Sequence, residues 1–153
     1  MKASKILFFS LICLMAFSAN AQEYVDLGLP SGTLWKDVNE EEALYNYYDA
    51  LDQFDENLPT LSQLRELKSK CTWTWTGKGY KVTGPNGNSI ILPVTGFSDC
   101  AGNGELKGSG GSYWSSAPVD AKKAWFLGFG PGSVSIGNDM NCYGRAVRLV
   151  RSR

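Results

Sequence analysis

The stretch from Gly111 to Arg151, GSYWSSAPVDAKKAWFLGFGPGSVSIGNDMNCYGRAVRLVR, limits the fold more than any other part of the chain. It combines large aromatic side chains with closely spaced glycines and shows almost no helical signal. Apolar residues alternate with other residues over 125–129, over Ser133–Ile136 and over Arg145–Arg151, and this period of two predicts β-strands. Turns are expected where glycine, proline and asparagine gather, at Gly130-Pro131-Gly132 and at Gly137-Asn138.

Helical patterns occur in the first half of the chain. Apolar residues recur at helical spacing over Glu40–Phe54, with acidic residues at the start, and predict an amphipathic helix. A second helix is expected to begin after Thr60, because Thr60 and Gln63 have the spacing of a capping box, and to end at Cys71. Strict alternation over Thr72–Thr76 then predicts a strand whose two tryptophans belong to the core rather than to a sugar-binding platform.

Short strands complete the predicted domain. Glu23–Leu29 and Thr33–Val38 are expected to form a hairpin or bent ribbon. The last strand of the chain is expected to pair with the first of these two strands. Gly79–Thr83 and Ser89–Val94 flank Asn86-Gly87, a pair typical of tight hairpin turns. The sequence therefore predicts an α+β fold, with two helices early and short antiparallel strands joined by long loops.

The N-terminus has the pattern of a secretory signal peptide over residues 1–21. Two lysines precede an apolar run over Ile6–Phe17, and Ala19-Asn20-Ala21 fits a cleavage site. The apolar run is shorter than the roughly 20 residues that a membrane span needs. We therefore expect no transmembrane segment after cleavage, and we expect residues 22–153 to be secreted, periplasmic or at the cell surface.

The charge of the mature chain excludes one class of partner. The whole chain has 15 basic and 15 acidic residues, and loss of the two leader lysines leaves a net charge of about −2. Before the last predicted strand, no basic run is longer than Lys122-Lys123. The chain therefore lacks the basic patch of a nucleic-acid-binding protein, and no nucleic-acid partner is expected.

Three cysteines follow the predicted leader, and an oxidising compartment permits one disulfide. Cys100 and Cys142 are the favoured pair because both lie in segments rich in glycine and asparagine, whereas Cys71 ends a helix and is expected to be buried. Three unpaired thiols are the alternative. The chain has no histidine and no C-x-x-C motif, so no zinc site is expected.

Six motifs follow one another across nearly all of residues 22–153. They are YVDLGLPSGTLW at Tyr24–Trp35, LPT at Leu58–Thr60, CTWTWT at Cys71–Thr76, GYKVTGPNGNSIILP at Gly79–Pro93, YWSS at Tyr113–Ser116 and AVRLVR at Ala146–Arg151. In this order they resemble the Fibrobacter-type major paralogous domain, a family common in secreted and surface proteins of gut Bacteroidetes. The resemblance implies a single C-type lectin-like domain over residues 22–153, a fold shared with formylglycine-generating enzymes and with the variable receptors of diversity-generating retroelements.

The resemblance also implies a ligand-binding site between the YWSS and AVRLVR motifs, where the retroelement-diversified receptors carry their variable residues. Two aromatic members of this set are expected to belong mainly to the core, and four polar members are expected in an exposed loop. The core pair is Trp125 and Phe129, the loop residues are Asn138, Asp139, Asn141 and Tyr143, and the set is completed by Ser133 and Ser135.

These features favour a non-catalytic binding module that presents loops 98–112 and 130–144 to a glycan or a protein at the cell surface. The alternatives are a structural or accessory domain of a fimbria-like surface assembly and, with least support, an enzyme such as a glycosidase. No enzyme is expected, because the chain lacks histidine, a G-x-S-x-G motif and a phosphate-binding loop that leads into a helix. The oligomeric state is left open.

No cofactor is expected from the sequence, although calcium stays open. Oxygen-bearing side chains occur in both long loops, yet their spacing is not that of an EF-hand. Gly84-Pro85-Asn86 and Gly137-Asn138-Asp139 also lack, respectively, the acid and the tryptophan of calcium-dependent lectin motifs. The oxygen-bearing residues are Asp99, Asn103, Glu105, Asn138, Asp139 and Asn141.

Overall fold

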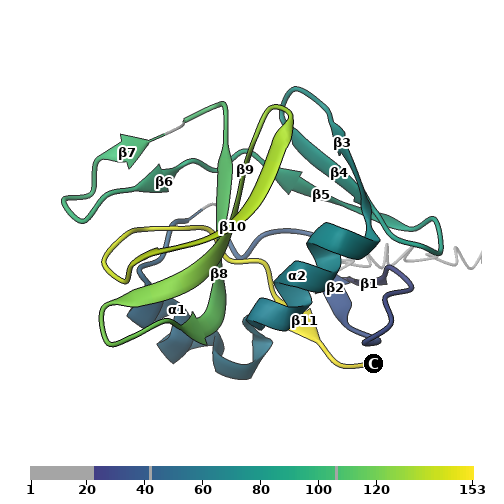
Figure 1. Ribbon diagram of the computed structural model, residues 1–153, viewed down its shortest axis with the longest axis horizontal. Helices are drawn as coiled ribbons and strands as arrows, with labels where there is room; N and C mark the ends of the chain where they lie inside the picture. The colour runs from purple at the N-terminus through teal and green to yellow at the C-terminus, as the bar shows by residue number, and fades with distance from the viewer. Residues whose placement is uncertain (1–22, 42, 106) are drawn as a thin grey trace, which may run out of the picture.

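Antiparallel strands form most of the regular secondary structure of the domain (Figure 1). The structure is a computed structural model that describes residues 23–41, 43–105 and 107–153, so the predicted signal peptide at 1–21 lies outside the described residues. Three sheets have the strand orders β1-β2-β11, β3-β4-β5 and β10-β9-β8, and a fourth pairs β6 with β7. The strands are β1 (Tyr24–Asp26), β2 (Leu34–Lys36), β3 (Thr72–Trp75), β4 (Gly79–Thr83), β5 (Ser89–Pro93), β6 (Phe97–Ser98), β7 (Gly104–Glu105), β8 (Gly111–Pro118), β9 (Lys123–Gly130), β10 (Ser133–Met140) and β11 (Val150–Arg151).

Helices contribute less than the sequence predicts. The described residues form α1 (Tyr47–Phe54, eight residues), a 3-10 turn at Asp55–Asn57 and α2 (Leu61–Lys70, ten residues). Against these two short helices stand eleven strands in four small antiparallel sheets. The predicted α+β, C-type lectin-like fold is therefore wrong, and the domain is mostly β.

The late start of α1 explains part of this difference. Residues 40–46, expected to be helical, run beside the C-terminal segment, apart from residue 42, which is not described. The Glu40 N–H donates to the Val147 carbonyl at 2.9 Å, and Tyr45 and Arg145 exchange two backbone hydrogen bonds of 2.8 and 2.9 Å. In a helix over Glu40–Phe54 the Tyr45 N–H and C=O would both have been paired locally, whereas here both have a distant partner.

The second helix follows the sequence prediction closely. The Gln63 N–H donates to Thr60 Oγ1 at 3.1 Å, and the Thr60 N–H donates to Gln63 Oε1 at 2.8 Å, which confirms the capping box. Leu64 and Leu67 are buried on one side of α2, and Cys71 is its C-cap. β3 follows directly, as the alternation of threonine and tryptophan predicts.

The β4–β5 hairpin is also confirmed. Its register runs from Gly79 opposite Pro93 to Thr83 opposite Ser89, and Gly87 in the turn has a φ of 88°, in the left-handed region that glycine tolerates. The base of the turn lies against the start of the chain: a Cβ at Gly84 would be 2.0 Å from the Leu27 carbonyl oxygen. A larger residue at this position would push the two segments apart.

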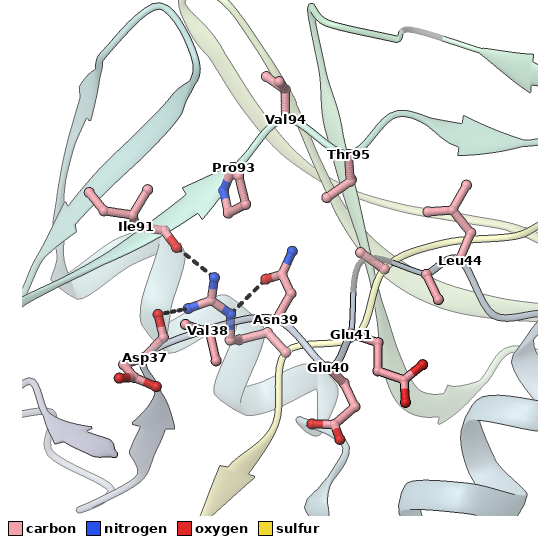
Figure 2. A pocket seen from close by; sticks show the side chains of 13 residues that line it. Asp37, Val38, Asn39, Glu40, Glu41, Leu44, Ile91, Pro93, Val94 and Thr95 are labelled. Atoms are coloured by element: carbon pink, nitrogen blue, oxygen red, sulfur yellow. Dashed lines mark hydrogen bonds between the residues drawn. The ribbon is translucent and has the colours of Figure 1, made fainter. Parts of the chain in front are cut away.

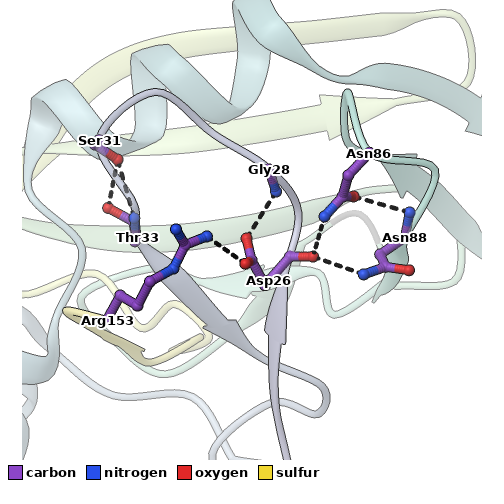
Figure 3. A network of polar contacts seen from close by, with 7 residues as sticks. All are labelled: Asp26, Gly28, Ser31, Thr33, Asn86, Asn88 and Arg153. Atoms are coloured by element: carbon purple, nitrogen blue, oxygen red, sulfur yellow. Dashed lines mark hydrogen bonds and ion pairs between the residues drawn. The ribbon is translucent and has the colours of Figure 1, made fainter.

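Both ends of the described chain meet beside this hairpin (Figure 3). The Asn86 and Asn88 side-chain amides donate to the Asp26 carbonyl at 2.8 and 2.9 Å, and the Asp26 carboxylate pairs with Arg153. The last strand joins the N-terminal ribbon as expected, but through a different partner: Val150 lies opposite Trp35 of β2, so β2 and not β1 pairs with β11.

The β8-β9-β10 sheet has a hydrophobic cluster on each face. Successive side chains of a strand point to opposite faces, so Tyr113 belongs to one cluster and its neighbour Trp114 to the other. The first cluster also includes α2 and the β3-β4-β5 sheet, and the second is closed by α1. Buried members of the first cluster are Leu27, Leu29, Trp35, Leu64, Leu67, Tyr80, Val82, Ile90, Leu92, Tyr113, Leu127, Phe129, Ala146 and Val150. Those of the second cluster are Tyr47, Ala50, Leu58, Trp114, Ala124, Val147 and Leu149.

Strand β10 is longer than expected. The turn predicted at Gly137-Asn138 is wrong. β10 continues through these two residues, because Asn138 pairs with Trp125 of β9 and the ladder extends to Met140. The other predicted turn, at Gly130-Pro131-Gly132, is confirmed: Pro131 and Gly132 connect β9 to β10. The glycine-rich loop 98–112 contains the small β6–β7 hairpin, and the favoured disulfide between Cys100 and Cys142 is present.

Candidate ligand-binding pocket

A pocket of about 830 Å³ lies between the chain that follows β2 and the chain that leaves β5 (Figure 2). This volume is within the range of small-ligand sites in proteins. Its lining combines carboxylates with aliphatic side chains, and it contains no aromatic ring among the described residues. The lining residues are Asp37, Val38, Asn39, Glu40, Glu41, Ala43, Leu44, Ile91, Pro93, Val94, Thr95, Ala146 and Arg148.

The guanidinium of Arg148 holds the two walls together. The side chain is 1% exposed, yet no carboxylate binds it among the described residues. Instead Nε donates to Asn39 Oδ1 at 2.8 Å, Nη1 donates to the Lys36 and Asp37 carbonyls at 2.9 Å, and Nη2 donates to the Ile91 carbonyl at 2.5 Å. A buried charge needs such hydrogen bonds, so the arginine fixes the chain after β2 against β5.

Tyr113 extends this network beneath the pocket. Asn39 Nδ2 donates to the Tyr113 hydroxyl at 3.0 Å, and that hydroxyl donates to the Pro93 carbonyl at 2.9 Å. Burial raises the pKa of Tyr113 to about 12, against the lowering effect of the nearby Arg148 charge. Desolvation lowers the pKa of Arg148, but a guanidinium keeps its proton at neutral pH. The network beneath the pocket thus joins a neutral phenol, which does not line the pocket, to a charged guanidinium that does.

The walls expose apolar side chains to solvent. Val38 is 48% exposed, Leu44 is 39% exposed and Ile91 is 47% exposed. They are three of the six exposed large apolar side chains in the described part of the chain, and all three line this pocket. An apolar surface gathered in one concave place is typical of a binding site.

Acidic side chains surround the apolar walls. Asp37 and Glu41 are exposed and form no ion pair with any described residue, whereas Glu40 pairs with the buried amine of Lys36. Glu41 also has a φ of 43°, which is uncommon for a residue other than glycine and recurs at functional sites. The rim therefore presents two carboxylates that have no direct ion-pair partner among the described residues.

The residues that the resemblance nominated do not share this pocket. They lie along β9, along β10 and in the turn after β10, and none of them lines the pocket. Asn141 is buried rather than exposed, and Phe129 belongs to the first cluster as expected. Exposed side chains are those of Ser133, Ser135 and Asn138; Trp125, Asp139 and Tyr143 are half-buried; Phe129 and Asn141 are buried.

Two of these residues surround a second buried arginine. Arg145 Nη2 lies 3.1 Å from Asp139 Oδ2, and the Arg145 guanidinium carbon lies 3.6 Å from the ring centre of Phe126 and 5.6 Å from that of Tyr143. Burial lowers the pKa of Arg145 to about 10, so this group is still protonated at neutral pH. Asp139 and Tyr143 thus have partners inside the domain.

The sequence does not predict the pocket, because most of its lining residues carry the patterns of regular helices and strands. The chain after β2 has the pattern of a helix that begins at Glu40, and Arg148 lies in a predicted strand over Arg145–Arg151. The signal that could have revealed the site is Arg148 between Val147 and Leu149, because an arginine within an apolar run must find acceptors wherever it is buried.

Cys71 is half-buried and unpaired, and we expect it to react slowly. Burial, assisted by the charge of Glu66, raises the pKa of its thiol to about 11. At pH 8 only about one thiol in a thousand is then ionised, so alkylation by iodoacetamide should be about 100-fold slower than in urea and should accelerate as the pH rises. Mass spectrometry of timed samples measures both rates. Equal rates in the folded and unfolded protein would contradict this burial.

The described residues contain no candidate membrane span and no candidate metal-binding cluster. No helix there is both long and apolar enough to span a bilayer, and no group of three or more histidine, cysteine, aspartate or glutamate residues there could hold a metal ion. Asp99, one of the residues considered for calcium, accepts hydrogen bonds of 2.9 Å from the Ala101 and Asn103 N–H groups. This carboxylate therefore stabilises its own turn.

Fold and pocket together define a small, mostly β domain with a ligand-sized hollow at the junction of its N-terminal and C-terminal segments. The model of a protein family, Domain of unknown function (DUF8237), matches residues 73–150, about half of the chain, and the chain belongs to this family. The match includes β4 to β10 and Arg148. No curated protein and no solved structure matches the chain. The resemblance to the Fibrobacter-type family stays a prediction from the motifs.

Proposed function

We propose that this protein is a non-catalytic binding module that is secreted, periplasmic or bound to the cell surface. Its ligand binds in the pocket described above, which is called the Arg148 pocket below. One observation carries the proposal: Val38, Leu44 and Ile91 expose apolar surface around a hollow whose rim bears two unpaired carboxylates. Exposing apolar surface costs free energy, and such surface collected in a concave site is typical of a protein that covers it with a ligand.

The chemistry of the pocket favours a protein ligand over a glycan. Aliphatic walls suit the side chains of leucine, valine or isoleucine, and the Asp37 and Glu41 carboxylates suit lysine or arginine beside them. No aromatic ring of the described residues lines the pocket, so stacking on a sugar face is not supported. The ligand that fits best is a protein segment with an apolar side chain next to a basic one.

Charge reversal at the rim tests this proposal. Peptide arrays that combine Lys or Arg with Leu, Val or Ile should give binders, and Asp37→Lys with Glu41→Lys should weaken the best of them by about tenfold or more, because two attractions become repulsions. Fluorescence anisotropy measures the affinity. The matched control is Asp52→Lys with Glu56→Lys, two exposed acids outside the pocket, which should leave affinity unchanged.

A second variant tests how much the apolar wall contributes to peptide binding. Ile91→Ser should weaken binding of the same peptide. Val119→Ser changes an exposed apolar residue outside the pocket and should leave binding unchanged. Binders found only on a glycan array, or acidic peptides that bind as tightly as basic ones, would refute the proposed ligand class.

A further inference from the structure

One edge of the central sheet lacks backbone partners. The outer edge of β8 is covered, because Gly111 bridges Gly96 and Tyr113 bridges Ala146. On the other side β10 pairs with β9 alone among the described strands. β10 is eight residues long and contains neither lysine nor proline, two residues that protect exposed edges in many proteins.

The register defines which groups are free. The two-residue turn places Ser133 opposite Gly130, so the odd-numbered residues of β10 bond to β9 and the even-numbered ones direct their N–H and C=O groups outward. Met140 satisfies both of its groups, on Asp139 Oδ1 and on the Tyr143 N–H. The register with β9 therefore leaves the N–H and C=O groups of Val134, Ile136 and Asn138 without a partner among the described residues.

A basic groove of about 680 Å³ runs beside this edge, between β10 and α2. Arg65 and Lys68 project from α2 and are exposed, and Arg65 also lies over the Trp125 ring at 5.9 Å. No acidic side chain lines the groove, and the one acid of β10, Asp139, is paired with Arg145. The groove therefore presents positive charge beside unsatisfied strand groups.

We propose that the β10 edge binds an extended acidic segment of a partner protein as an added strand. The backbone of that segment pairs with Val134, Ile136 and Asn138, and its carboxylates contact Arg65 and Lys68. A second copy of this chain fits less well, because antiparallel pairing of two β10 strands would bring one basic groove toward the other. This surface is separate from the Arg148 pocket, and neither proposal depends on the other.

The probe for this surface is a blocked, labelled octapeptide of alternating Glu and Thr, compared with its Lys and Thr counterpart. The acidic peptide should bind, and the basic one should not. Arg65→Glu with Lys68→Glu should lower the affinity for the acidic peptide by about tenfold or more. Lys70→Glu with Lys78→Glu, two exposed lysines that do not line the groove, serves as the matched control and should leave binding unchanged.

Amide hydrogen exchange on the wild-type protein adds a readout that needs no variant. The Val134, Ile136 and Asn138 amides should exchange about tenfold more slowly with the acidic peptide bound, whereas exchange at Asp37 and Leu44 should not change. Three outcomes would overturn the proposal: equal binding of the two peptides, no protection of the three amides, or protection that appears without peptide as the protein dimerises.

Discussion

Replacing Arg148 with methionine should lower the free energy of unfolding by about 4 kcal/mol. The side chain donates to three backbone carbonyls and to Asn39, and methionine fills much of the same volume without a donor. The Lys36, Asp37 and Ile91 carbonyls would lose a charged donor, and each buried polar group left unsatisfied costs about 1–3 kcal/mol. Urea unfolding followed by tryptophan fluorescence measures the loss.

Two controls define what the arginine does. Arg148→Lys keeps the charge but cannot reach all four acceptors, so it should recover part of the lost stability. Arg151→Met removes an exposed arginine that lies over the Tyr24 ring at 4.4 Å and should cost about 1 kcal/mol or less. If Arg148→Met were as stable as Arg151→Met, the network beneath the pocket would not hold the two walls together.

Loss of the disulfide should have an effect of similar size. The Cys100–Cys142 bond closes a loop of 42 positions, and the entropy that such a cross-link removes from the unfolded chain corresponds to about 4 kcal/mol. It joins the connection between β6 and β7 to the turn after β10, so Cys100→Ala with Cys142→Ala should also loosen the β6–β7 hairpin. Urea unfolding gives the stability, and hydrogen exchange at Phe97 and Ser98 reports the local loosening.

The remaining cysteine supplies the control for this experiment. Cys71→Ala leaves the bridge intact and removes one half-buried sulfur, so its cost should be about 1 kcal/mol. Reduction with dithiothreitol should reproduce the double variant, since both bridge cysteines are exposed. A reduced protein as stable as the oxidised one would show that the bridge does not constrain the unfolded chain.

Features governed by neighbours in the chain could be predicted from the sequence. The Thr60–Gln63 capping box depends on four consecutive residues, the β3 alternation on five, and the β4–β5 turn on Asn86-Gly87. In each case the interacting groups lie within a few positions of one another. Local chemistry decided these elements, and tertiary contacts did not override it.

Features governed by distant partners could not be predicted in this way. Residues 40–46 carry a helical pattern, but backbone groups of Glu40 and Tyr45 pair with Val147 and Arg145, about 100 positions later. Gly137-Asn138 has the composition of a turn, but the ladder with β9 continues through it. Long-range pairing decided these elements, and the overestimate of helix led to the wrong fold class.

The pocket belongs to the same category. The network beneath it requires Arg148, Asn39 and Tyr113 to meet, and these residues lie in three segments far apart in the chain. The resemblance in motif order instead predicts a site among residues 125–143. Several of these residues have partners inside the domain. Exposed apolar residues such as Val38 and Ile91 become informative only when the structure brings them together.

Tyr113 and Trp114 are adjacent in the chain but belong to different hydrophobic clusters. The C-terminal segment divides in the same way, with Ala146 in the first cluster and Val147 in the second. Melting either cluster would therefore remove one supporting face from the wall that bounds the other. Because the two clusters share this wall, we expect the described domain to unfold as one unit rather than as two semi-independent halves.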